Sequence, residues 1–272
     1  MAALATAGAV VLTGVLTGCG TQAGPRHSPA APVTTSVTAP DTPAAGAGSG
    51  PASGRTTTAP RKTLKLGAKG KSVTWLQRRL TELGYQPGKA DGRYGGTTLA
   101  AVWAFQKVND IKPTSTVAKR TWDALEAPKP PKILVRNGKP TRAEVNLTKQ
   151  IMVLYVGGQV KLITHVSSGS GIPYCETATW QGKEQRFCGS ASTPTGNYKT
   201  TWRASGWHKS YLGELYNPVF FNGGIAFHGA LSVPLYPASH GCVRMPMNVA
   251  QVLPGMLGKG VPVHVRGKFR RA

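Results

Sequence analysis

Apolar residues follow two different periods along this chain, and the change of period divides it into two regions. Between about residues 64 and 125 they recur every three to four positions, as on amphipathic helices. One helix is expected from Val73 to a glycine C-cap at Gly84, a second over residues 97–109, and a shorter one over residues 117–125. The turn residues 91–95 separate the first two. A small all-α unit of three helices is predicted.

After the proline-rich stretch at residues 128–132, which suits a stiff linker, the period becomes two. Residues 143–147 alternate, residues 151–156 are almost continuously apolar, and Gly157-Gly158 provides a hairpin turn to a strand over residues 160–166. Further strands are expected at residues 198–202, 219–221, 225–227 and 261–265. Only residues 247–256 suit a short helix, which Pro254 limits. The C-terminal half is therefore predicted to be mainly β.

The first eighteen residues are almost wholly apolar and end in Leu16-Thr17-Gly18, which Cys19 follows directly. This arrangement resembles the lipobox of bacterial lipoproteins, which predicts export and lipidation of Cys19. No Lys or Arg precedes the run, unlike in a typical signal peptide, so a cleaved signal with an incidental cysteine and a single-pass anchor stay open. Residues 20–62 are rich in Ala, Pro, Thr, Ser and Gly and predict a disordered linker.

The charge balance is strongly positive, with 33 Lys and Arg against 10 Asp and Glu, a net charge of +23 and a pI near 10.3. Such a charge favours a polyanionic neighbour, which is nucleic acid, an anionic membrane or an acidic cell-wall polymer. Export makes nucleic acid unsuitable and leaves the cell envelope.

The four cysteines leave one free thiol. If Cys19 carries lipid, Cys175 and Cys188 lie thirteen positions apart in one polar segment and are the natural disulfide, which in the loop-entropy model stabilises by roughly 3 kcal/mol. Cys242 then stays unpaired. A zinc site is the competing explanation, but no close Cys-x-x-Cys or His-x-x-x-His pair is present, and we expect no metal.

The candidate chemistry is concentrated in Ser239-His240-Gly241-Cys242-Val243-Arg244, with His228-Gly229 fourteen positions before the cysteine. A cysteine thiol needs a base to become a nucleophile, and two histidines are available. The spacing alone does not separate the role of His228 from that of His240.

The helical region has a specific resemblance. Its order of residues is Gly67, Gly70, Val73, Leu76-Gln77, Leu80, Leu83-Gly84, Asp91-Gly92-Arg93-Tyr94-Gly95, Thr98, Ala101-Val102, Phe105-Gln106, Thr121-Trp122 and Leu125. Over residues 63–127 this order resembles the three-helix peptidoglycan-binding domain of bacterial cell-wall enzymes. Residues 112–116 depart from the family, which often repeats Asp-Gly there. A purely structural helical spacer is the alternative.

The C-terminal region resembles the catalytic domain of bacterial L,D-transpeptidases over residues 142–266. The motifs that carry this resemblance are Val166-Ser167-Ser168-Gly169, Thr193-Pro194-Thr195-Gly196, His228-Gly229 and Ser239-His240-Gly241-Cys242. The fold class implied is multidomain, with a small all-α three-helix peptidoglycan-binding domain followed by a mainly-β L,D-transpeptidase catalytic domain. Residues 128–141 link the two, and residues 267–272 form a basic tail.

The resemblance also assigns roles. Cys242 would be the nucleophile, His228 its base, oriented by the Gly229 carbonyl, and His240 would shape the oxyanion loop. The backbone N–H groups of Gly241 and Cys242 would bind the oxyanion, and Ser239 would form hydrogen bonds within the loop. Arg244 would hold a substrate carboxylate, with surface charge as the alternative, and the groove would be lined by Tyr236, Trp207 and Tyr211. The segment between Cys175 and Cys188, longer than in the family, is expected to be a disulfide-pinned insertion near the active site.

The function implied is transfer of a stem tetrapeptide through a Cys242 thioester to a second stem, which forms a 3–3 peptidoglycan cross-link without a cofactor. Inactivation by carbapenem-type β-lactams through the same cysteine is also implied. Two alternatives stay open, an L,D-carboxypeptidase and a non-catalytic wall-binding protein. We expect an extracytoplasmic monomer, held at the membrane by an N-terminal lipid and bound to peptidoglycan and acidic wall polymers.

Overall fold

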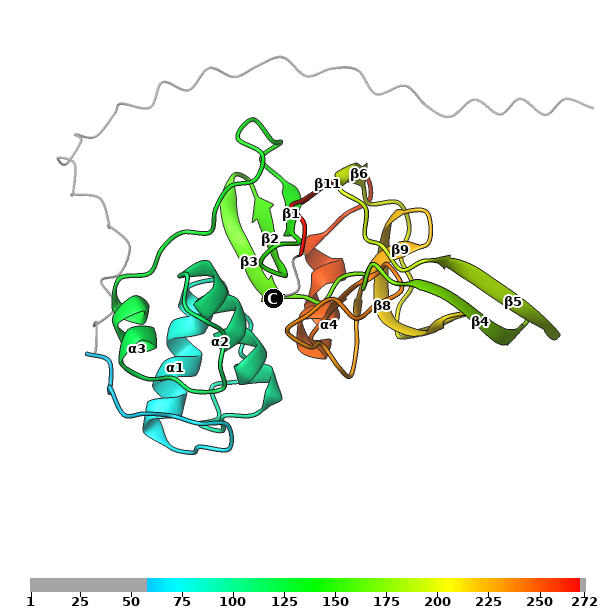
Figure 1. Ribbon diagram of the computed structural model, residues 1–272. Helices are drawn as coiled ribbons and strands as arrows, with labels where there is room; N and C mark the ends of the chain where they lie inside the picture. Colours follow the sequence, from blue (N-terminus) through cyan, green and yellow to red (C-terminus); the bar gives the residue numbers. More distant parts are fainter. Residues whose placement is uncertain (1–57, 270–272) are drawn as a thin grey trace, which may run out of the picture. The chain divides into compact units, whose positions relative to one another are not determined.

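The computed structural model describes residues 58–269, which form three helices followed by a mainly-β region, as predicted (Figure 1). The leader with Cys19, most of the linker predicted over residues 20–62, and residues 270–272 lie outside the described residues. The helices and strands are α1 (Lys71–Glu82), α2 (Gly96–Val108), α3 (Lys119–Glu126), β1 (Arg142–Asn146), β2 (Ile151–Val156), β3 (Gln159–His165), β4 (Pro173–Trp180), β5 (Lys183–Ser190), β6 (Gly196–Lys199), β7 (Trp207–Ser210), β8 (Gly213–Asn222), β9 (Ile225–Gly229), β10 (Val243–Met245), α4 (Met247–Met256) and β11 (Pro262–Arg266).

Two buried glutamines hold the turns of the helical module. The Gln77 amide of α1 donates to Asp91 Oδ1 at 2.9 Å and accepts from the Gly92 N–H at 2.9 Å. Gln106 of α2 likewise accepts from the Thr114 N–H at 2.8 Å and donates to the Thr116 carbonyl at 3.1 Å. The turn at residues 112–116 departs in sequence from the peptidoglycan-binding family. It is nevertheless closed in the same manner as the turn at residues 91–95, because a buried amide must satisfy both its donor and its acceptor.

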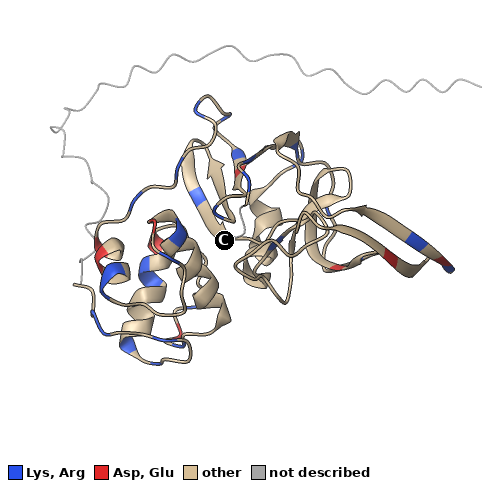
Figure 2. Cartoon of the chain, in the orientation of Figure 1, with Lys and Arg blue, Asp and Glu red and all other residues tan. Residues whose placement is uncertain are grey.

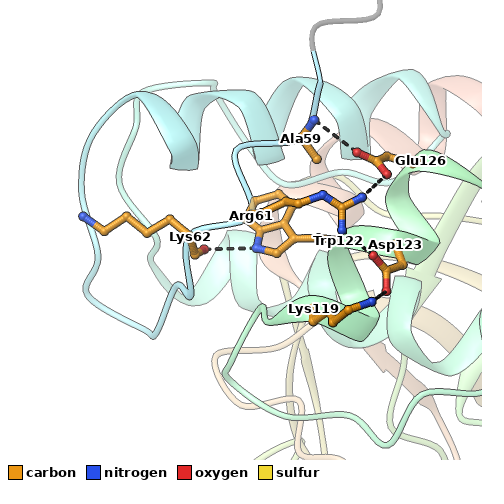
Figure 3. Close-up of polar contacts among 7 residues, drawn as sticks. All are labelled: Ala59, Arg61, Lys62, Lys119, Trp122, Asp123 and Glu126. Carbon is orange, nitrogen blue, oxygen red and sulfur yellow. Dashed lines mark hydrogen bonds and ion pairs between the residues drawn. The ribbon is translucent and has the colours of Figure 1, made fainter.

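The ordered module begins before the predicted boundary at residue 63. Figure 3 shows the segment from Ala59 to Lys62 lying against α3. The Trp122 indole N–H donates to the Lys62 carbonyl at 3.0 Å, and the Ala59 N–H donates to Glu126 at 3.3 Å. Arg61 forms ion pairs with Asp123 and Glu126. The last residues of the predicted disordered linker are therefore ordered by contacts that local composition does not reveal.

The mainly-β region contains three sheets. Five strands pair in the order β3-β2-β1-β11-β6, four in the order β10-β9-β8-β7, and β4 pairs only with β5. The larger two sheets and α4 enclose one apolar core that includes Leu154, Phe227, Met245 and Leu253. The β9–β10 pair is parallel, with His228 opposite Arg244. This pairing carries the candidate residues.

Strand β2 has both faces covered, which explains its almost continuous apolar sequence. Met152 and Leu154 belong to the core of the sheets, whereas Ile151, Val153 and Tyr155 belong to the apolar cluster of the helical module. In addition, the Ile163 N–H donates to the Gly84 carbonyl at 2.8 Å. The module and β2–β3 thus share a continuous core, a relation that the sequence did not predict.

The proline-rich linker is held at both ends. The Lys129 N–H donates to Asn109 Oδ1 at 2.8 Å, and the Leu134 N–H donates to Glu144 Oε2 at 2.6 Å. Glu144 also forms a buried ion pair with Arg142 at 2.6 Å. Within residues 58–269 no helix is both long and apolar enough for a membrane span, and no group of His, Cys, Asp and Glu side chains is arranged to hold a metal.

Candidate active site

The parallel β9–β10 pair brings Cys242 and His228 to one cavity. Phe227 lies opposite Val243 and His228 opposite Arg244, so Cys242, which directly precedes β10, lies beside Ala226. Side chains two positions apart share a face of a sheet, which places Ala226 and His228 on the face of Cys242 and Arg244. Cys242, His228 and Arg244 all line a cavity of about 710 Å³.

His228 is a buried, neutral imidazole with a defined orientation. The residue is only 4% exposed, and Nδ1 lies 2.9 Å from the Gly229 carbonyl oxygen. A carbonyl only accepts, so Nδ1 carries the proton and Nε2 presents its lone pair. Burial lowers the pKa of His228 to about 4, despite the opposing effect of this hydrogen bond. At neutral pH the ring can therefore accept a proton.

Gly229 has a steric role beside its carbonyl contact. A Cβ at this position would lie 2.9 Å from the Ala250 Cβ and 3.0 Å from the Met247 sulfur, both on α4. The absence of a side chain lets α4 pack directly under the end of β9. The Gly229 carbonyl that holds His228 is fixed by this packing.

Cys242 is the one free cysteine among residues 58–269, since Cys175 and Cys188 form a disulfide. Its Sγ lies 3.6 Å from the Gly224 carbonyl and accepts from the Ala226 N–H at 3.5 Å. Burial raises the pKa of the thiol, and the Ala226 hydrogen bond and Arg244 partly oppose this. The cavity therefore contains a protonated thiol and a neutral imidazole, the two groups that a base-assisted attack by sulfur requires.

The loop before Cys242 is closed on itself by Ser239. The Ser239 hydroxyl donates to the Cys242 carbonyl, and the Gly241 N–H donates to Ser239 Oγ at 3.1 Å. Gly241 has a φ of 143°, a backbone conformation suited to glycine. The expected hydrogen bonding of Ser239 is thus present. The expected oxyanion donor at Gly241 is not free, because its N–H is bonded within the loop, so Cys242 N–H remains the candidate donor.

Two further segments hold this loop. The Thr193 hydroxyl donates to the Gly241 carbonyl at 2.5 Å and accepts from the Gly169 N–H at 2.8 Å. The Ser168 carbonyl accepts from the Ser239 N–H at 3.0 Å. Thr193 was missed as a site residue, although the Thr-Pro-Thr-Gly motif that begins with it was noted. Its position only becomes meaningful once the loop at residues 239–242 lies against it.

His240 is held from outside the loop by the β4–β5 hairpin. Its Nε2 lies 2.7 Å from Glu176 Oε1, and its ring makes an edge contact with Tyr174 at a centroid distance of 4.7 Å. The Cys175–Cys188 disulfide joins the two hairpin strands. The predicted insertion thus lies at the cavity, with Tyr174 and Trp180 in its lining. Glu176 and Tyr174 were missed because the polar hairpin gives no sequence signal for them.

The predicted substrate-binding residues have different positions. Arg244, Trp207 and Tyr211 line the cavity. In the described part of the chain, the Arg244 guanidinium forms no ion pair with a carboxylate, so it can bind an anionic group of a ligand in the cavity. Tyr236 is 57% exposed and is not part of the lining, while its carbonyl accepts from the Ser167 hydroxyl at 2.7 Å. The structure does not bring Tyr236 to the cavity.

Comparisons with known proteins agree with both regions. Residues 140–265 match the family model of the L,D-transpeptidase catalytic domain, and residues 69–125 match that of a peptidoglycan-binding domain. A crystal structure of an L,D-transpeptidase from Xylanimonas cellulosilytica is 36% identical, and the match covers 75% of this chain and 98% of that one with a TM-score of 0.66. An L,D-transpeptidase from Stackebrandtia nassauensis is 25% identical over 76% of this chain and 96% of that one, with a TM-score of 0.41.

The match spans nearly all of the crystallised part of the Xylanimonas enzyme, residues 123–326, and the family model covers both Cys242 and His228. The chain therefore belongs to the L,D-transpeptidase family of acyltransferases, with a peptidoglycan-binding domain in front of its catalytic domain.

Proposed function

We propose that this protein forms 3–3 cross-links in peptidoglycan through a thioester on Cys242. The observation that carries the proposal is that the free Cys242 thiol and a buried, neutral His228 line the same cavity. The peptidoglycan-binding domain supports the same polymer as substrate. The net charge of +23 favours contact with acidic wall polymers, and Figure 2 shows Lys and Arg on both the helices and the strands.

In the acylation step, His228 Nε2 takes the thiol proton while Cys242 Sγ attacks the carbonyl of the donor stem before its terminal D-residue. The carbonyl oxygen becomes negative and is stabilised by the Cys242 N–H, a contribution that is on the order of 3 kcal/mol for one donor. The C–N bond then breaks, and His228 returns the proton to the leaving amine. The acyl group stays on sulfur as a thioester.

In the transfer step, the side-chain amine of a second stem attacks the thioester, and His228 removes a proton from that amine. The C–S bond breaks, the thiolate takes up the proton, and the two stems are joined through their third-position residues. Arg244, which lines the cavity with a free charge, would bind a substrate carboxylate. The protein would act outside the cytoplasm, held to the membrane by a lipid on Cys19, a residue outside the described range.

The test is to incubate the purified protein with tetrapeptide muropeptides and identify the products by mass spectrometry, beside Cys242→Ala. Cross-linked dimers that depend on Cys242 are expected. Tripeptides without dimers would instead indicate hydrolysis, an L,D-carboxypeptidase activity. No change that depends on Cys242 would refute catalysis and leave a binding protein.

A further inference from the structure

The β4–β5 hairpin is a separate two-stranded sheet that pairs with no other strand. Most of its residues are exposed. An isolated two-stranded hairpin has marginal stability in water. The Cys175–Cys188 disulfide joins directly opposed residues of the two strands and compensates for the missing core. The chain thus maintains a hairpin that contributes little to its own core, which suggests a role at the cavity.

The two faces of the hairpin differ. Side chains alternate along each strand, so Glu176 and Tyr174 project from the face opposite to Cys175. The residue opposite Tyr174 is Gly189, and the ring of Tyr174 lies so close that a Cβ there would be 3.0 Å from its hydroxyl oxygen. Tyr174 and Glu176 both contact His240. The disulfide therefore fixes the strands from one face while the other face holds His240.

The same face has a second attachment that fixes its position. Phe187, opposite Glu176, stacks on Tyr211 at a centroid distance of 4.2 Å, and Trp180 makes an edge contact with that ring at 6.2 Å. Tyr211 belongs to the turn between β7 and β8 and lines the cavity. The hairpin is thus bound to the cavity wall through Phe187 and Trp180, on the same face as Glu176.

His240 depends on this hairpin for its orientation. The backbone of its loop is held by Ser239, Thr193 and Ser168, all in the body of the domain. In residues 58–269, the hydrogen bond and the aromatic contact of the His240 ring are those with Glu176 and Tyr174. A carboxylate only accepts hydrogen bonds, so His240 Nε2 carries a proton that points to Glu176, and this contact sets the orientation of the ring.

We propose that Glu176 is a positioning residue that orients the His240 side chain, in the loop before Cys242, from the disulfide-fixed hairpin. This inference rests on the proposed function, because the effect on chemistry is an effect on acylation of Cys242. Glu176 itself acts only through His240. The hairpin is then a part of the active site. The activity of the protein therefore depends on the Cys175–Cys188 disulfide, which holds the two hairpin strands together.

The test measures acylation of Cys242 by tetrapeptide muropeptide and, separately, by a carbapenem, both followed by intact-protein mass. In Glu176→Ala we expect the acylation rate to fall roughly tenfold, the effect of losing one charge-assisted hydrogen bond. Glu176→Gln keeps an acceptor oxygen and should recover part of the rate. Glu184→Gln is the matched control, since Glu184 lies on the same hairpin but on the disulfide face.

Nitrogen-15 NMR of labelled histidine gives a second measurement in the resting protein. The His240 signals, assigned by comparison with His240→Gln, should show a proton on Nε2 in the wild type and in Glu184→Gln. They should show a mixture of tautomers in Glu176→Ala and in Cys175→Ser/Cys188→Ser. A purely structural role for Glu176 would not move this signature.

The outcomes separate the inference from the proposed function. If the wild type is acylated and Glu176→Ala reacts at the wild-type rate, the inference is wrong while the proposed function stands. If the wild type is not acylated by either reagent, the proposed function fails, and the NMR comparison still decides whether Glu176 orients His240. Unchanged His240 signals in Glu176→Ala overturn the inference in either case.

Discussion

The replacement of His228 by glutamine tests whether the candidate base is buried in its neutral form. The folded pKa of His228 is lowered to about 4 by burial, whereas a histidine in the unfolded chain titrates near 6.5. Between these values the unfolded chain binds a proton that the folded one does not. Stability therefore falls as the pH falls through this window. At pH 4.5 the contribution of His228 to this loss is about 2.5 kcal/mol.

Urea unfolding, followed by tryptophan fluorescence at pH 7.5 and pH 4.5 with the disulfide intact, measures this loss. His228→Gln has no titrating group at this position, so its loss on acidification should be about 2.5 kcal/mol smaller than that of the wild type. His208→Gln, which changes a second cavity histidine and leaves His228 in place, should retain the His228 contribution. The rate of Cys242 acylation should also decline in acid with an apparent pKa of about 4. Equal losses of stability in His228→Gln and the wild type would refute the reasoning.

Three further predictions follow from local packing and charge. Gly169→Ala places a Cβ 2.3 Å from the Ala191 carbonyl oxygen, so it should lower the free energy of unfolding by about 1–3 kcal/mol and slow the acylation of Cys242. Gly255→Ala, which has open space around its Cβ, should change neither quantity. Thermal unfolding and the mass of the acyl adduct measure the two effects, and an unaffected Gly169→Ala would contradict the steric argument. Arg142→Met leaves the fully buried Glu144 carboxylate without its cation, so the free energy of unfolding in urea should fall by about 3–5 kcal/mol. A loss of stability near zero would show that the ion pair is not needed for the fold. Arg61→Ala removes two ion pairs between half-exposed side chains, and because water screens such pairs, the unfolding temperature should stay almost unchanged. A large drop in the unfolding temperature would mean that residues 59–62 stabilise the helical module through charge.

Local sequence was sufficient for elements whose periodicity reflects a buried face. Helices α1 to α3, the short α4 and the β2–β3 hairpin all lie where the apolar pattern placed them, because each buries an apolar face. The β4–β5 hairpin gave only a weak signal, because one of its faces is half-buried and the other is exposed. The ordering of residues 59–62 was also missed, because it depends on contacts with α3 more than fifty positions away.

The features of the candidate site likewise come partly from local sequence and partly from tertiary structure. The sequence by itself determined the chemical groups, namely one free thiol, two histidines nearby and a pair of cysteines close enough to join. Only the tertiary structure decided their relation. The parallel β9–β10 register placed His228 on the face of Cys242 and buried it, while Glu176, sixty-four positions before His240, turned that ring toward the hairpin. Hydrogen bonding and burial act between neighbours in space, and chain spacing does not encode which neighbours the strands bring together.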